Sequence, residues 1–130
     1  MEKIDWDNLG FNVVETRSMY KGICRKGEEW KLGGLIPYGT IELSPAAGVL
    51  NYGQGCFEGT KAYRTVKDRV VLFRPEMNAK RMALSTKRLC IPEMNQEYFL
   101  NAVEETLKAV SYTHLRAHET EADLVCRLLL

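Results

Sequence analysis

The pattern of hydrophobic and polar positions in the first third of the chain predicts β-strands, although the alternation over residues 11–25 is imperfect. Residues 11–25 (FNVVETRSMYKGICR) are rich in Val, Thr, Tyr and Ile, which predicts one long strand or a strand bent at Gly22. The pair Gly33–Gly34 predicts a turn. Apolar and acidic residues alternate over 41–43, which predicts a further short strand before Ser44 and Pro45 end it.

The rest of the chain predicts a hairpin followed by two helices. Residues 61–64 and 70–73 are β-type runs joined by a polar link of hairpin length, so we expect an antiparallel pair. A helix is expected from Pro75, because proline is tolerated at the first helical position, and Pro92 prevents its continuation. A second helix is expected from about residue 96 to 109, since Asn is a suitable N-cap and apolar residues follow at helical spacing.

Length and charge exclude several classes of protein. A chain of 130 residues suffices for one domain. Eighteen basic and seventeen acidic residues leave a net charge of +1, so no general electrostatic attraction to nucleic acid or to an anionic membrane is expected. No run is long enough to span a bilayer. The acidic N-terminus has no apolar signal core and does not resemble an organelle transit peptide, which predicts a cytoplasmic protein.

The cysteines indicate a reducing compartment. They show neither C-x-x-C spacing nor a nearby cluster of metal ligands, so we expect incidental thiols and no metal. The four residues are Cys24, Cys56, Cys90 and Cys126.

The stretch Leu50–Arg64 (LNYGQGCFEGTKAYR) concentrates glycines and aromatics, and it is the first candidate for a site. Its glycines permit left-handed angles or close approach of another group. Tyr52 and Phe57 flank this run as two potential walls of an apolar pocket. The alternative is a tight corner whose aromatics belong to the core. Glu58 lies at the expected rim of the sheet, where a structural pairing is favoured over a role as general base, and its role stays open.

Arg81 is the second candidate. It lies one turn beyond Met77 on the first helix, and a guanidinium there can hold a phosphate with paired N–H donors. The alternative is a solvated surface charge.

Three stretches resemble a known family. GVLNYGQGCFEGTKAYR, VVLFRPEMNAKRM and the opening DWDNLGF are similar to the N-terminal half of branched-chain amino acid aminotransferases, which are class IV pyridoxal-phosphate-dependent enzymes. The resemblance runs from Asp5 to about Ala109. D-amino acid aminotransferases and aminodeoxychorismate lyases of the same fold share the FEG motif and the later arginine, but NYGQG and DWDNLGF favour the branched-chain enzymes.

The resemblance implies a fold and an activity. Residues 1–109 are expected to form the small N-terminal domain, an α+β (two-layer α/β) fold with an antiparallel sheet and two helices. The implied reaction transfers an amino group between leucine, isoleucine or valine and 2-oxoglutarate, with pyridoxal 5'-phosphate as cofactor. A homodimer or larger homo-oligomer is implied for the intact enzyme. The rival hypothesis is a stand-alone binding or interaction module.

The resemblance also implies residue roles. Arg81 matches the arginine that binds the cofactor phosphate, while Phe11, Tyr52 and Phe57 match positions that shape the pocket for the substrate side chain. The lysine that binds the cofactor covalently belongs to the family's second domain, and no lysine here matches it. We therefore expect no catalytic residue and no transaminase activity in this chain, and an exposed apolar face.

The tail, residues 110–130, does not match the family, whose Leu-Tyr-Ile-Arg-Pro type strand is absent. Back-translated, SYTHLRAHET and LVCRLLL resemble two parts of a transposase-type sequencing adapter, which favours read-through residues that were never selected to fold. The alternatives are a genuine amphipathic helix and a helical metal site of His114, His118 and Glu119.

Overall fold

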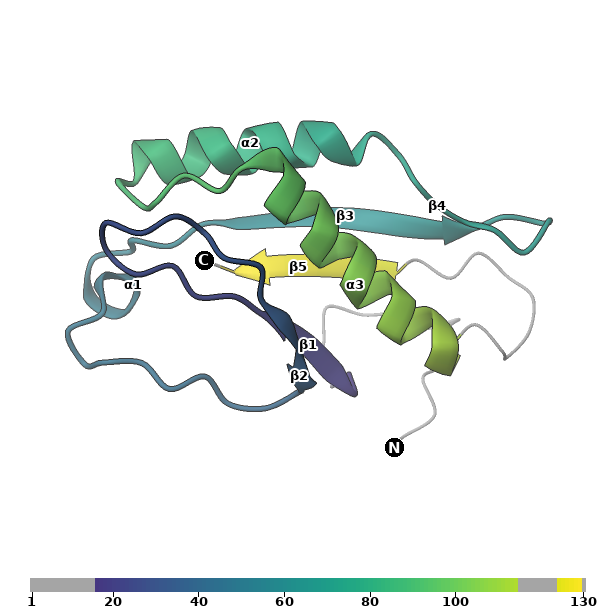
Figure 1. Cartoon of the computed structure of the whole chain (residues 1–130), viewed down its shortest axis with the longest axis horizontal. Coiled ribbons are helices and arrows are strands. Elements are labelled where there is room, and N and C mark those ends of the chain that lie inside the picture. Colours follow the sequence, from purple (N-terminus) through teal and green to yellow (C-terminus); the bar gives the residue numbers. More distant parts are fainter. Residues whose placement is uncertain (1–15, 115–123, 130) are drawn as a thin grey trace.

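The computed structural model describes residues 16–114 and 124–129, and it describes side-chain burial over residues 16–109. In chain order the elements are β1 (Ser18–Lys21), β2 (Gly34–Pro37), α1 (Gly48–Asn51), β3 (Phe57–Arg64), β4 (Val70–Leu72), α2 (Pro75–Arg88), α3 (Gln96–His114) and β5 (Leu124–Leu129). They form two small antiparallel sheets with helices packed beside them (Figure 1). The expected α+β class is confirmed.

Two hairpins build most of the sheet structure. β1 pairs with β2, with Ser18 opposite Pro37. β3 pairs with β4, and the backbone N–H of Thr65 donates to the carbonyl of Arg69 at 2.8 Å to close the connecting turn. Asp68 occupies a left-handed conformation in that turn, which Asp tolerates better than most residues. The hairpin predicted from the two β-type runs is confirmed.

The strand predictions fail elsewhere. β1 is only four residues long, so the long strand expected up to residue 25 is wrong within the described chain. Residues 41–43 are irregular, and no described strand pairs with them; a short β-type run is not stable without a neighbour. β3 already begins at Phe57, so Glu58 lies within the strand and not ahead of it at the rim of the sheet, where it was expected. The short helix α1 was not expected.

Local signals set the starts of both long helices. α2 begins at Pro75 with Glu76 in its first turn, and its buried residues lie on one face. At the start of α3 the backbone N–H of Tyr98 donates to Asn95 Oδ1 at 2.7 Å, which is the predicted N-cap. α3 continues to His114, beyond the expected end near residue 109.

The core lies between α2 and α3 and extends to the β1–β2 hairpin. Its buried cluster is Ala79, Met82, Met94, Tyr98, Phe99 and Val103. The Trp30 ring packs on the Tyr98 ring with centroids 5.2 Å apart, and Trp30 Nε1 donates to the carbonyl of Pro92 at 3.1 Å. α2 runs alongside β3, while α3 crosses in front of the sheet in Figure 1. One face of α2 therefore meets β3 directly.

The structure also places part of the tail. β5 pairs antiparallel with β3, from Phe57 opposite Leu129 to Ala62 opposite Leu124. A short apolar segment can pair with an open strand edge whatever its origin. The adapter origin of these residues stays a prediction, and His118 and Glu119 of the alternative metal site lie outside the described residues.

Candidate functional site

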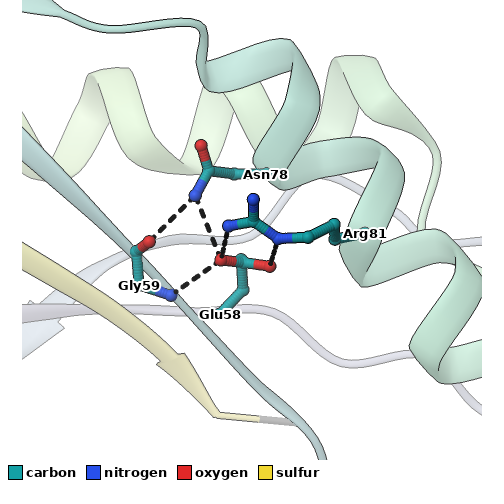
Figure 2. A network of polar contacts seen from close by, with 4 residues as sticks. All are labelled: Glu58, Gly59, Asn78 and Arg81. Atoms are coloured by element: carbon teal, nitrogen blue, oxygen red, sulfur yellow. Dashed lines mark hydrogen bonds and ion pairs between the residues drawn. The ribbon is translucent and has the colours of Figure 1, made fainter.

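A carboxylate of β3 meets a guanidinium of α2 where the two elements run side by side. Arg81 Nε donates to Glu58 Oε2 at 2.9 Å, and Arg81 Nη2 donates to Glu58 Oε1 at 2.5 Å. Figure 2 shows this two-point pairing, in which one edge of the guanidinium faces the carboxylate. Such bidentate pairs fix geometry as well as adding energy.

Asn78 supports the same carboxylate from one turn earlier on α2. Its Nδ2 donates to Glu58 Oε1 at 3.0 Å and to the carbonyl of Gly59 at 2.8 Å (Figure 2). Residues three apart on a helix share a face, so Asn78 and Arg81 both reach the strand. The Asn78 amide thus joins the helix to the backbone of β3.

The exposure of the two charged side chains differs strongly. The Glu58 side chain is 11% exposed and that of Arg81 is 59% exposed. Hydrogen bonding from Arg81 lowers the pKa of Glu58, and bonding from Asn78 also lowers it, although burial opposes both. Glu58 in turn raises the pKa of Arg81. The site therefore holds a largely buried anion with a cation that faces solvent.

Arg81 retains hydrogen-bonding capacity toward solvent. A guanidinium has five N–H donors, and Glu58 accepts two of them. Within the described part of the chain, Nη1 has no hydrogen-bond acceptor. The Nη1 and outer Nη2 donors form a second fork, which suits a phosphate or carboxylate.

The aromatic candidates are exposed. Phe57 directly precedes Glu58 and is 73% exposed, while Tyr52 at the end of α1 is 87% exposed. The alternative that both are core residues is therefore wrong. Gln54 Nε2 donates to the carbonyl of Leu89 at 2.9 Å, so the segment that carries Tyr52 is held at the C-terminal end of α2. Phe11 lies outside the described residues.

Glu58 is the residue whose partner the sequence did not reveal. A structural pairing was expected and is confirmed, but its partner lies 23 positions away and no local spacing indicates it. The sequence indicated this pairing only through the spacing of Asn78 and Arg81, which puts both on one face of the helix that follows the hairpin.

A separate surface hollow does not coincide with this site. It lies between the segment after β1 and the end of α2, where Cys24, Lys26, Lys87 and Cys90 line it. Arg81 does not line this hollow.

In the part of the chain that the structure describes, no three potential metal ligands come together. Among the described helices, none combines the length and apolar character needed to cross a bilayer.

Comparisons with known proteins give the N-terminal part of the chain clear relatives. It is 53% identical over 106 residues to "Branched-chain amino acid aminotransferase 2, chloroplastic" of Humulus lupulus, which covers 82% of this chain and 26% of that protein. It is 50% identical over 106 residues to "Branched-chain-amino-acid aminotransferase 2, chloroplastic" of Arabidopsis thaliana, covering 82% of this chain and 27% of that protein.

A bacterial relative shows the same pattern. The chain is 43% identical over 109 residues to "Branched-chain-amino-acid aminotransferase" of Helicobacter pylori, with 84% of this chain and 32% of that protein covered. No protein-family model matches the chain. The chain spans about a quarter to a third of the length of the curated relatives it matches.

Proposed function

This chain is, over most of its length, a homologue of the branched-chain amino acid aminotransferases, and from that premise we propose that it forms part of an enzyme transferring the amino group of leucine, isoleucine or valine to 2-oxoglutarate. The observation that carries the proposal is the identity shared with relatives that all bear this name. These names favour the branched-chain enzymes over D-amino acid aminotransferases and aminodeoxychorismate lyases.

The site suits a pyridoxal phosphate cofactor at its phosphate end. When bound, this cofactor supplies an electron sink for the amino acid's α-carbon. Arg81 is mostly exposed, and its outer N–H fork is directed away from Glu58. A planar guanidinium binds a phosphate through two parallel hydrogen bonds, which an ammonium cannot match. We assign Arg81 to the cofactor phosphate on these grounds.

Aromatic residues are assigned to the substrate pocket. Phe57 and Tyr52 are strongly exposed. Exposed aromatic rings often mark a surface that binds an apolar ligand or partner. We propose that the remainder of a longer protein covers them and that they then contact the branched side chain of the substrate. Phe11 is assigned to the same pocket by resemblance alone.

The 130-residue chain itself is proposed to be inactive, because no lysine in it matches the family's cofactor-binding lysine. Purified chain mixed with pyridoxal phosphate, leucine and 2-oxoglutarate should give neither the absorbance of a lysine-bound cofactor nor glutamate formation. The protein encoded by the complete gene serves as the positive control. Steady turnover by the 130-residue chain would contradict this proposal.

Three further assignments stay predictions. They are the homo-oligomeric state, the cytoplasmic location and the adapter origin of residues 110–130. Several relatives are named as chloroplastic or mitochondrial proteins, so location requires its own experiment. The nucleotide sequence of the tail decides the adapter origin, because codons that differ from the adapter would contradict it.

A further inference from the structure

We propose that Glu58 is a positioning residue: it holds Arg81 in the orientation that presents the outer N–H fork of the guanidinium to the cofactor phosphate. This inference rests on the proposed function, because it needs Arg81 to bind that phosphate. It assigns to the acidic residue of the Phe57–Gly59 stretch a role in binding and not in proton transfer.

The burial of the pair identifies Glu58 as its fixed member. Its side chain is 11% exposed, whereas that of Arg81 is 59% exposed. Glu58 is also held without Arg81, because Asn78 Nδ2 donates to its Oε1 at 3.0 Å. The backbone N–H of Gly59 adds a longer bond of 3.2 Å to the same oxygen. Arg81 is thus the more exposed partner, and a carboxylate held independently of it orients it.

The two-point contact determines the plane of the guanidinium. A single hydrogen bond leaves the group free to rotate, but bonds from both Nε and Nη2 to the two carboxylate oxygens define its plane and direction. The adjacent edge, formed by Nη1 and the second N–H of Nη2, is left outside this contact, and Nη1 points away from the Glu58 carboxylate (Figure 2). A phosphate at that edge meets an arginine whose conformational freedom is already lost, which favours binding.

The negative charge of Glu58 acts against this effect, and the structure limits it. The carboxylate pairs with the positively charged guanidinium itself, and both carboxylate oxygens already accept hydrogen bonds. Salt at about 0.15 M screens charges only beyond about 8 Å, so the positive charge of Arg81, and not salt, offsets the charge of Glu58 at the phosphate. Because this offset leaves only part of the repulsion, orientation is expected to outweigh it.

The experiment uses the 130-residue chain and four variants. Glu58→Gln removes the charge, and Glu58→Asp keeps it but shortens the side chain, so that two-point contact is lost. Arg81→Lys tests the anchor itself. Asp68→Asn is the control, because it removes a carboxylate that also pairs with an arginine, in the Arg64–Asp68 pair on the β3–β4 turn. Asn tolerates the left-handed conformation of that position.

Two readouts are measured at 0.15 M salt. The first is the affinity for pyridoxal phosphate relative to pyridoxal, which isolates the phosphate contribution. The second is the solvent exchange of the Arg81 Nε–H in nitrogen-15 NMR spectra. We expect both Glu58 variants to lower the affinity ratio roughly three- to tenfold, the cost of ordering one long side chain on binding. Both should also accelerate Nε–H exchange, whereas Asp68→Asn should change neither readout.

The outcomes separate the inference from the proposed function. If Arg81→Lys lowers the affinity ratio but both Glu58 variants leave it within about twofold of the parent chain, the positioning role is wrong and the anchor stands. An increase in the ratio for Glu58→Gln would also overturn the inference, since repulsion would then dominate. If Arg81→Lys has no effect, or the parent chain does not distinguish the two ligands, the phosphate anchor fails and the inference fails with it.

Discussion

Asn78→Ala tests the junction between α2 and β3 on which the site depends. Asn78 is 8% exposed, and its amide donates to the Gly59 carbonyl at 2.8 Å and to Glu58 Oε1 at 3.0 Å. A neutral hydrogen bond contributes about 1 kcal/mol and one to a charged group about 1.5–3 kcal/mol. The variant loses both, while Glu58 keeps its bonds from Arg81.

We therefore expect the free energy of unfolding to fall by roughly 2–4 kcal/mol, a large share of the 5–15 kcal/mol typical of a whole domain. The assay is urea unfolding followed by circular dichroism and tryptophan fluorescence. Asn51→Ala is the matched control, because its amide donates a similar bond of 2.9 Å to Pro45 from an exposed position. We expect that control to cost less than about 1 kcal/mol. A cost for Asn78→Ala no larger than that of the control would refute the reasoning.

Three further predictions concern the core and the thiols. A Cβ on Gly22 would lie 1.6 Å from Tyr98 Oη. Gly22→Ala should therefore lower the free energy of unfolding by about 1–3 kcal/mol through overpacking, and with it the thermal midpoint. Gly39→Ala, which has open space around it, should leave the midpoint unchanged. Burial raises the pKa of Tyr98 to about 12. The contribution of Tyr98 to the free energy of unfolding should therefore be constant below the ordinary tyrosine pKa of about 10 and fall as the pH rises toward 12, because the unfolded state ionises first. Urea titrations of Tyr98→Phe should lack that part of the fall. Burial also raises the pKa of the Cys56 thiol, so iodoacetamide followed by mass spectrometry should label the exposed Cys90 well before Cys56; equal rates would contradict this order.

Local chemistry made part of the fold predictable. Pro75 and Asn95 act within one helical turn, so their positions in the sequence identify the starts of α2 and α3. The hairpin was predictable because its turn joins neighbouring β-type runs. Residues 41–43 were not, since a strand exists only where a partner lies beside it and alternation does not show whether one is present.

The candidate site was predictable only in part. Arg81 was a candidate for binding a phosphate because the motif around it resembles a known family, and this role stays a proposal. Its pairing with Glu58 could not, because the contact depends on how α2 packs against β3 and not on sequence spacing. The exposure of Tyr52 and Phe57 likewise follows from packing, which periodicity does not determine.

The most direct test of the central claim is a crystal structure of the protein encoded by the complete gene with pyridoxal phosphate bound. We predict that the outer Nη atoms of Arg81 lie about 3 Å from phosphate oxygens, while Glu58 still accepts from Nε. A phosphate bound by other residues, with Arg81 directed into solvent, would contradict the account.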